Sequence, residues 1–311
     1  MSRGDGNRST IAYAIAFLSL AGAFLAGCRD SEFDWLASSR HRSTGWIGEF
    51  KDDRFLAGRE YWVYLPPGYD PLRRRYPVLY LHDGQVVFRR ASGDPNSWGV
   101  DSACDSLILS GAMEPLIVVG ITSGSTRFYD LTPKDVGPIE GGYATGGGNA
   151  YLSAIARDVK PLVDARFATL RDPAHTYIAG ASLGGLISMY AGYAFGGTFG
   201  RVASLSGSFD TYFGADTLFQ LARRGRPATL DRLYLDSGTV DDNLGEARFM
   251  RDIVLAHGFT EGASDFLYLE ALGDQHGDYW FGRRMPLVLR FLAGSAAASA
   301  PTGRVAASAV H

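Results

Sequence analysis

The sequence predicts an α/β protein in which helices cover both faces of a mostly parallel central sheet. Short apolar segments bounded by turn residues alternate with segments of helical periodicity, as in a doubly wound sheet. Several of the apolar segments are continuous rather than alternating, as expected of parallel strands buried on both faces. No internal repeat or linker-like break interrupts them, so we expect one domain over residues 43–293.

The predicted strands are spread along this whole domain. They are Tyr61–Leu65, Val78–His82, Leu116–Ile121, Thr176–Ala179, Val202–Leu205, Leu233–Asp236 and Phe266–Ala271. An antiparallel hairpin around residues 46–65 is expected to lie at one edge of the sheet.

Three further segments, two between these strands and one after the last of them, are predicted to be helices. The clearest begins near Asn149, a residue suited to the N-cap, and carries apolar groups at helical spacing as far as Phe167. An earlier helix runs from about Trp98 to Leu109 with Ser97 as its candidate cap, and the final helix runs from about Trp280 to Leu292.

The N-terminus is typical of an exported lipoprotein. Two arginines precede an uncharged apolar run, Ile11–Leu25, which is too short for a comfortable membrane span but fits a signal-peptide core. The run ends in Leu-Ala-Gly-Cys28, which resembles the bacterial lipobox. We predict a signal peptide over residues 1–27, a lipid on Cys28 that anchors the protein to the bacterial cell envelope, and a polar linker over residues 28–42. A plain cleaved signal with Cys28 incidental is the alternative.

Charge and cysteine content limit which kinds of partner, disulfide and metal site the protein can have. The net charge of −3 gives no basic field for nucleic acid. Beyond Cys28 only Cys104 remains, so no internal disulfide is expected and Cys104 is interpreted as a small buried apolar residue. No Cys/His cluster suggests a metal, and no cofactor is expected. The Ala/Ser/Gly-rich tail over residues 294–311 is predicted to be disordered, and the oligomeric state is not indicated.

The segment Gly180-Ala181-Ser182-Leu183-Gly184 indicates a catalytic site. It lies between the predicted strand Thr176–Ala179 and a helical segment, Leu186–Tyr193, which is the strand–turn–helix setting of a nucleophile elbow. Glycines two residues before and after the serine remove side chains that would block so sharp a turn. The pattern predicts Ser182 as a nucleophile.

A serine nucleophile needs a base, and on such a turn the acid and then the histidine follow it in the chain. Of the three later histidines, His257 precedes a glycine at a helix end and His311 is the last residue. His276 lies just after the strand Phe266–Ala271, where α/β sheets place functional groups. We therefore predict His276 as the base.

The acid has three candidates in Asp236, Asp241 and Asp242, which follow or end the strand Leu233–Asp236. We predict Asp241, because a carboxylate that orients the histidine should reach it from the loop beyond the strand. Asp236 is interpreted as bonding nearby backbone donors, and Asp242 as capping the next helix.

Backbone amides are expected to stabilise the oxyanion. One is that of Leu183, after the nucleophile, and the second is that of Gln85, in the turn that follows the strand Val78–His82. His82 and Asp83 could form a second dyad, but we interpret both as anchors of that turn.

These segments together resemble the esterase D-like family of α/β hydrolases, which includes feruloyl, siderophore and acetyl esterases, S-formylglutathione hydrolase and mycolyltransferases. The matching stretches are YPVLYLHDGQ, LIVVGI, GASLGG, DSGTVDD and GDQHGDYW, spread over residues 45–293. The resemblance implies an α/β-hydrolase fold and the triad Ser182, Asp241 and His276, with the Gln85 and Leu183 amides as oxyanion donors. HDGQ and STRFYDLTP are most similar to the siderophore-esterase branch, although Tyr129 stands where that branch commonly has arginine.

The predicted function is hydrolysis of a small-molecule carboxylic ester through an acyl-serine, with aromatic or polyhydroxy esters preferred to long-chain lipids. Three residues are candidate substrate contacts: Trp98 and Trp280 through an aromatic acyl pocket, and Arg127 through an anionic group or simply by pairing with Asp130. Acyl transfer to another alcohol uses the same triad, and a non-catalytic binding lipoprotein is the third alternative.

Overall fold

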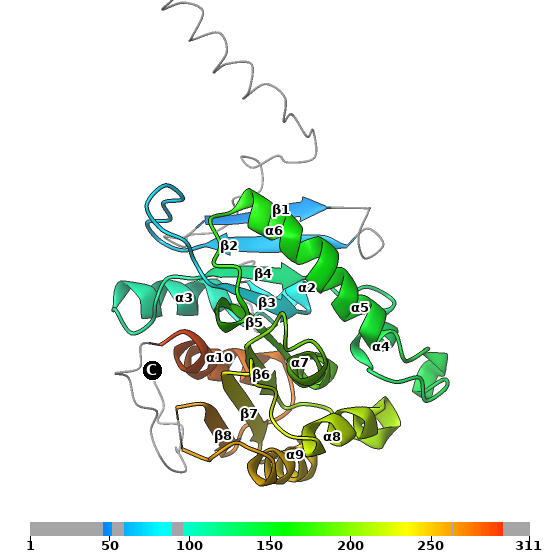
Figure 1. The fold of residues 1–311 in the computed structure, drawn as a ribbon. Helices are drawn as coiled ribbons and strands as arrows, with labels where there is room; N and C mark the ends of the chain where they lie inside the picture. The colour runs from blue at the N-terminus through cyan, green and yellow to red at the C-terminus, as the bar shows by residue number, and fades with distance from the viewer. Residues whose placement is uncertain (1–45, 52–58, 89–95, 263, 295–311) are drawn as a thin grey trace, which may run out of the picture. The chain divides into compact units, whose positions relative to one another are not determined.

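Eight described strands form one sheet in the order β1-β2-β4-β3-β5-β6-β7-β8 (Figure 1). The computed structural model describes residues 46–51, 59–88, 96–262 and 264–294, with the backbone alone for 46–51, and all of them belong to one unit over residues 35–311. The strands are β1 Trp46–Lys51, β2 Glu60–Leu65, β3 Val78–His82, β4 Ile117–Ile121, β5 Thr176–Ala181, β6 Arg201–Leu205, β7 Arg232–Gly238 and β8 Phe266–Ala271.

The strand directions place the loops that carry the candidate site. β1 and β2 are antiparallel to their neighbours, and β2 pairs with β4 in that sense. From β4 to β8 every neighbouring pair is parallel. The loops that follow β3, β5, β7 and β8 therefore leave the same edge of the sheet, which is where α/β sheets bind ligands.

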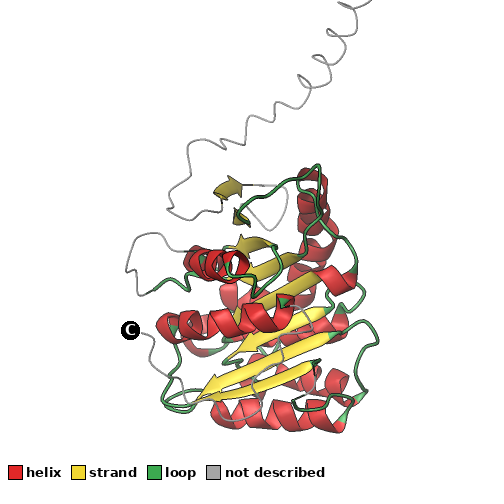
Figure 2. Ribbon diagram, turned by 90° about the vertical axis from the view of Figure 1, so that its left-hand side faces the viewer, coloured by secondary structure: helices red, strands yellow, loops and turns green. Residues whose placement is uncertain are grey.

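Helices cover both faces of the sheet (Figure 2). α3 and α10 pack against each other, while α7, α8 and α9 pack in series and α4 contacts α5 and α7. The helices are α2 Gly84–Val87, α3 Val100–Leu109, α4 Arg127–Leu131, α5 Gly148–Ala154, α6 Lys160–Arg166, α7 Leu183–Ala194, α8 Ala215–Arg223, α9 Leu244–Ala256 and α10 Asp278–Ala293. None of the helices in the described residues has the length and apolar character needed to cross a membrane.

The predicted fold class, strands and edge hairpin are confirmed, with strand ends shifted by one or two residues. The helix expected from Asn149 to Phe167 is α5 and α6 joined by a π-helical turn, Ile155–Val159. Pro161, which has no N–H to donate to the carbonyl four residues earlier, follows that turn. Asn149 does not cap this helix, because α5 begins at Gly148 and the Asn149 side chain accepts a hydrogen bond from Tyr190.

Side chains from the central strands and from α3 and α10 form an apolar core. Fully buried members include Leu79, Leu81, Val118 and Leu205 from the strands and Val288 from α10. Cys104 of α3 is buried in this core as a free thiol, as the sequence predicted. Ser97 does not cap α3 at its N-cap position, which Gly99 occupies, but its hydroxyl accepts a hydrogen bond from the Gly99 amide. Cys28, the signal and linker segments and residues 295–311 lie outside the described residues.

Candidate active site

Ser182 lies on a strained turn between β5 and α7. Its φ and ψ are 59° and −123°, a backbone conformation that non-glycine residues rarely adopt. The turn is fixed at both ends, because the Ser182 amide donates to the Leu205 carbonyl at 3.0 Å and its carbonyl accepts from the Ser208 amide at 3.1 Å. Gly180 is required here, since a Cβ on it would lie 2.7 Å from the backbone of Gly184. The structure thus shows the elbow predicted from the sequence.

His276 is paired with Asp242. The His276 Nδ1 lies 2.8 Å from Asp242 Oδ1, and the imidazole is about one-third exposed (33%) while the carboxylate is fully buried. The two loops are in direct contact, because the Val240 amide donates to the Asp274 carbonyl at 3.1 Å. One ring nitrogen of His276 is therefore bonded to a buried carboxylate, while part of the ring remains exposed to solvent.

The prediction of Asp241 as the partner of His276 is wrong. Asp241 is exposed, and the backbone turns there with a positive φ of 46°. This turn directs the next side chain, that of Asp242, toward the His276 loop. Asp242 is not the cap of α9 either, since Asn243 holds that position.

Four donors converge on the Asp242 carboxylate. His276 and the Asn243 amide bond Oδ1, while the Ser206 hydroxyl and the Gly238 amide bond Oδ2. Burial alone would raise the pKa of Asp242, but these hydrogen bonds hold it at about 2. Asp242 is therefore a carboxylate throughout the neutral range, and it favours the imidazole tautomer with a proton on Nδ1.

Asp236 has a structural environment, as the sequence suggested. It is completely buried in β7, where it accepts hydrogen bonds from the Tyr234 hydroxyl at 2.7 Å and the Ser206 amide at 3.0 Å. Arg284 of α10 lies 3.0 Å from it as an ion-pair partner. The same guanidinium donates to the Ser206 hydroxyl at 2.7 Å, which in turn bonds Asp242.

A cavity of about 180 Å³ lies beside Ser182. Its lining comprises Asp83, Gln85, Val86, Trp98, Arg127, Ala181, Ser182, Asp278 and Phe281. The ring of Phe281, which lines this cavity, contacts that of His276 edge-on, with centroids 5.1 Å apart. No group of three or more His, Cys, Asp or Glu side chains in the described part of the chain could hold a metal ion.

Of the three predicted substrate contacts, two line the cavity and one does not. Trp98 lines the cavity and donates from Nε1 to Asp278 Oδ1 at 2.9 Å. Trp280 does not line this cavity and instead lies against Arg283, whose guanidinium is 5.1 Å from the indole ring centroid. Arg127 lines the cavity but is paired with Asp83.

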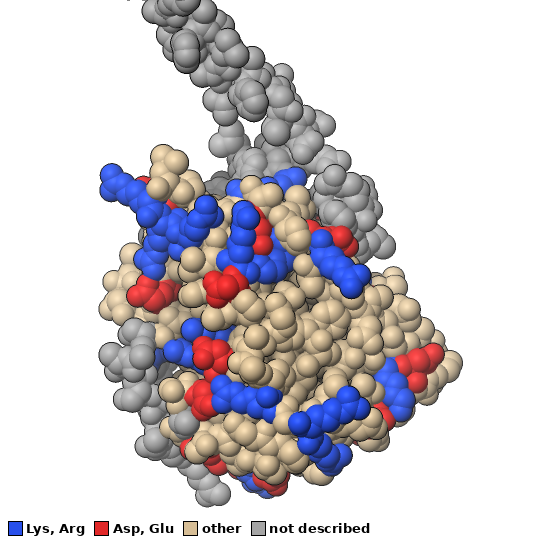
Figure 3. All heavy atoms as spheres, viewed as in Figure 1, with Lys and Arg blue, Asp and Glu red and all other residues tan. Residues whose placement is uncertain are grey.

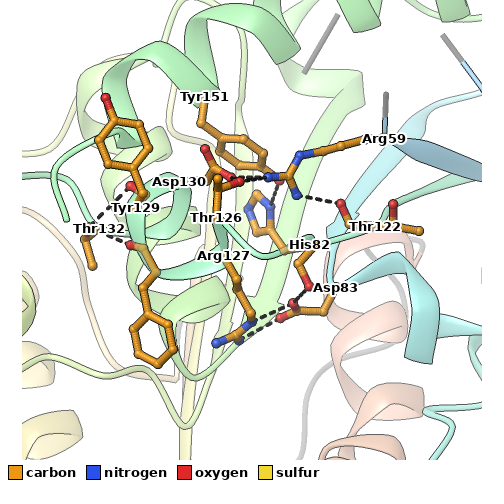
Figure 4. Close-up of polar contacts among 12 residues, drawn as sticks. Arg59, His82, Asp83, Thr122, Thr126, Arg127, Tyr129, Asp130, Thr132 and Tyr151 are labelled. Atoms are coloured by element: carbon orange, nitrogen blue, oxygen red, sulfur yellow. Dashed lines mark hydrogen bonds and ion pairs between the residues drawn. The ribbon is translucent and has the colours of Figure 1, made fainter. Parts of the chain in front are cut away.

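The ion pairs of Arg127 and Asp130 correct the sequence interpretation (Figure 4). Arg127 does not pair with Asp130. Its Nε and Nη2 donate to the two carboxylate oxygens of Asp83 at 2.7 and 2.8 Å. Asp130 instead accepts from Arg59 and from the Thr126 hydroxyl.

His82 and Asp83 do not form a second dyad. His82 is fully buried, and its Nδ1 lies 2.8 Å from the Tyr151 hydroxyl (Figure 4). Burial lowers the pKa of His82 to about 4, so this imidazole is neutral at pH 7. Both residues anchor the turn after β3, as the sequence predicted.

The two expected oxyanion donors lie on the turns beside the cavity. Leu183 is the first residue of α7, so its amide has no acceptor within the helix. Gln85, in the short helix α2 that follows β3, lines the same cavity as Ser182. Gly84 is required there, because a Cβ on it would lie 2.5 Å from the backbone of Gly120.

Several polar residues of this region received no role from the sequence, although Asp278 lies within the matching stretch GDQHGDYW. Ser206 and Ser208 follow β6, and the Ser208 hydroxyl lies 3.2 Å from that of Ser182. Asp278 begins α10 and lines the cavity. Their only common sequence signal is a place after, or close behind, a predicted strand.

Comparison with known proteins identifies the family. Residues 57–270 match the model of a family described as "Putative esterase". The chain belongs to this esterase family. The uncharacterized protein YbbA of Bacillus subtilis (strain 168) is 29% identical over 162 residues, which are 51% of this chain and 61% of YbbA.

Solved structures, two of them of esterases, share the fold. The enterobactin esterase FES from Shigella flexneri has a TM-score of 0.60 and 19% identity, covering 79% of this chain and 57% of its own. BES protein from Bacillus cereus has a TM-score of 0.62 and 19% identity, with 80% and 96% covered. A feruloyl esterase module from Clostridium thermocellum has a TM-score of 0.58 and 21% identity, with 79% and 87% covered. The chain thus spans less than two-thirds of YbbA and of FES, and the likenesses establish the α/β-hydrolase-like fold.

Proposed function

We propose that this protein hydrolyses carboxylic esters through an acyl intermediate on Ser182. The observation that carries the proposal is a strained serine at a cavity whose wall, through Phe281, contacts the imidazole of the Asp242–His276 pair. Membership of the esterase family supports the same reaction.

The residues have distinct roles in this reaction. Ser182 Oγ attacks the ester carbonyl carbon and gives its proton to His276 Nε2, the nitrogen left free because Nδ1 bonds Asp242. The Leu183 and Gln85 amides stabilise the oxyanion. The bond to the alcohol then breaks, and the alcohol leaves with the proton from His276.

Water completes the cycle. It attacks the acyl carbon, gives a proton to His276, and the acid leaves as that proton returns to Ser182. Asp242 remains ionised throughout, in keeping with its pKa of about 2, and stabilises the imidazolium that forms twice in each turnover.

The substrates we propose are esters with an aromatic or polyhydroxy group rather than long-chain lipids. Trp98 and Phe281 give the cavity two aromatic walls, and the charged side chains of Asp278, Asp83 and Arg127 make the rest of the wall polar. A long alkyl chain would exclude water from these polar groups without replacing their hydrogen bonds. Comparison of kcat/KM for feruloyl, catecholate and long-chain acyl esters tests this, and a higher value for the long-chain esters would contradict it.

The nucleophile is tested by Ser182→Ala with Ser106→Ala as its matched control. Ser106 is an exposed serine of α3, away from the cavity. We expect Ser182→Ala to lower turnover of a p-nitrophenyl ester by on the order of 10⁴-fold or more while the Tm stays close to that of wild type. Turnover within about tenfold of wild type would contradict the assignment, since triad losses are far larger.

The proposed location is the bacterial cell envelope, with the protein held by lipid on Cys28. The support is the apolar run that ends in Leu-Ala-Gly-Cys28. One acyl chain binds a membrane only marginally, so stable anchoring requires more than one. Mass spectrometry of the mature N-terminus should find acylated Cys28 as the first residue, and an unmodified or missing Cys28 would contradict the proposal.

A further inference from the structure

The turn that carries Gln85 contains a second strained residue. Asp83, between β3 and α2, has φ and ψ of 57° and 44°, the left-handed region that residues other than glycine seldom occupy. This conformation sets the direction in which the chain leaves β3, and hence where the Gln85 amide points. Something must hold Asp83 in it.

Ser123, in the loop after β4, and Arg127, the first residue of α4, supply those contacts, and Figure 4 shows the pairing of Arg127 with Asp83. The Asp83 carboxylate, which is nearly buried (6% exposed), accepts both hydrogen bonds of the Arg127 fork and a third from the Ser123 hydroxyl at 2.5 Å. The Ser123 amide donates to Gln85 Oε1 at 3.0 Å, and Gln85 Nε2 donates to the Ser123 hydroxyl at 2.8 Å. Asp83 and Gln85, on either side of Gly84, are thus both tied to one neighbouring loop.

We infer that Arg127 and Asp83 form a clamp that positions the Gln85 amide for the oxyanion. Arg127 is then a positioning residue that acts through Asp83 and the turn. The inference rests on the proposed function, because it requires that Gln85 serve as an oxyanion donor.

The charge of Arg127 is committed to this clamp. A guanidinium that binds a carboxylate with two parallel N–H groups forms one of the stronger and more directional ion pairs in proteins. Consistent with that pairing, the pKa of Asp83 is lowered even though its burial would raise it. An anionic substrate group would meet a neutralised arginine and the additional carboxylate of Asp278 in the same cavity. The pairing therefore argues against Arg127 as an anion-binding residue.

The test compares Arg127→Met and Arg127→Lys on two esters, neutral p-nitrophenyl acetate and anionic p-nitrophenyl hemisuccinate. An oxyanion donor acts only in the transition state, so its misplacement lowers kcat and leaves KM nearly unchanged. Loss of one donor costs about 10²–10³-fold in kcat. We expect Arg127→Met to lose about 10- to 100-fold in kcat on both esters, with KM within about threefold, because the donor is displaced rather than removed.

Arg127→Lys should recover only part of this loss, since an ammonium keeps the charge but not the two-pronged geometry. Phenylboronic acid, which forms a tetrahedral adduct with an active serine, should bind Arg127→Met more weakly in proportion to the fall in kcat. The matched control is Arg248→Met. Arg248 makes the same two-pronged contact with Glu270, at 2.8 Å for both bonds, on α9 and β8. Its kcat should equal that of wild type.

Two results would overturn the inference while the wild-type protein is an active esterase. One is an unchanged kcat in Arg127→Met. The other is a rise in KM confined to the anionic ester, which would make Arg127 a substrate-binding residue. If Arg127→Met fails to fold, Arg127→Lys and Asp83→Asn carry the same comparison. Wild-type protein that hydrolyses neither ester and leaves phenylboronic acid unbound would instead refute the proposed function.

Discussion

His276 with Asp242 and His82 with its sequence neighbour Asp83 both lie near the carboxyl ends of strands, and the two combinations differ in nearly every property that catalysis needs. His276 is partly exposed and bonds the buried carboxylate of Asp242 across two loops. His82 is completely buried against Tyr151, and its sequence neighbour Asp83 bonds Arg127 instead. His276 of the first pair contacts Phe281 of the cavity wall, whereas the His82 side chain lies close to Gly184.

The difference shows that adjacency in sequence is a poor guide to a dyad. Asp83 follows the last residue of β3 in a left-handed conformation, and its carboxylate bonds Arg127 while the His82 ring bonds Tyr151. A catalytic base must also be able to hold a proton in the folded protein. Burial lowers the pKa of His82 to about 4 and so removes that ability, while four hydrogen bonds keep Asp242 ionised to stabilise a charged His276. The face shown in Figure 3 carries charged groups of both signs.

The largest expected effect separates the two histidines. His276→Gln removes the base, and we expect turnover to fall by on the order of 10⁴-fold or more. His82→Gln should keep turnover within about tenfold of wild type, because His82 contributes packing and one hydrogen bond rather than proton transfer. Steady-state kinetics of both variants on one ester is the measurement. Equal losses would remove the distinction between the pairs.

The second effect separates two adjacent carboxylates. Asp242→Asn should favour the wrong imidazole tautomer, and the corresponding aspartate-to-asparagine change in a serine protease lowers kcat about 10⁴-fold. Asp241→Asn is the matched control, since asparagine tolerates the positive φ of 46° at that position. Its kcat should stay near that of wild type. A large loss of kcat in Asp241→Asn, together with an active Asp242→Asn, would make Asp241 the acid.

The third effect is the change in the free energy of unfolding with pH. Folded His82 has a pKa of about 4, whereas an unfolded histidine titrates near 6.5. Above pH 6.5 both states are neutral; as the pH falls toward 4 the unfolded state binds a proton that the folded state does not. The free energy of unfolding should therefore fall by up to about 3 kcal/mol over this window.

Urea unfolding of wild type and His82→Gln at pH 7, 5.5 and 4 measures this contribution. The variant should lose less stability on acidification than wild type. Asp242 has the opposite sense: its low pKa stabilises the fold above about pH 4, and that contribution is lost only as the pH falls toward 2. The two groups therefore act in separate pH ranges. Identical pH dependence of wild type and His82→Gln would show that His82 titrates normally.

The smallest effect concerns the partner of His82. Tyr151→Phe removes the hydroxyl that bonds His82 Nδ1 and leaves a buried imidazole nitrogen without that partner. We expect a loss of about 1–3 kcal/mol in the free energy of unfolding, with kcat unchanged within about threefold. Thermal or urea unfolding measures the first and ester turnover the second. A loss of turnover comparable to that of His276→Gln would place His82 in the reaction.

The sequence predicted most of this fold because its strands are short apolar runs with clear turn boundaries, and the element that holds Ser182 has its own motif. It predicted His276 by chain order and elimination. It predicted Asp241 rather than Asp242 as the partner of His276, because the correct choice depends on a single positive φ at Asp241 that turns the next side chain inward. The sequence also could not show that Arg127 pairs with Asp83 rather than Asp130, because the two residues are 44 positions apart in the chain.

The most direct test of the central claim is to trap the nucleophile. A fluorophosphonate probe forms a covalent bond only with a serine that is activated by a base and faces an oxyanion site. After reaction with the wild-type protein, tandem mass spectrometry should locate one adduct on Ser182, and labelling should be slowed strongly in Asp242→Asn but not in Asp241→Asn. No adduct, or an adduct on a serine other than Ser182, would contradict the account.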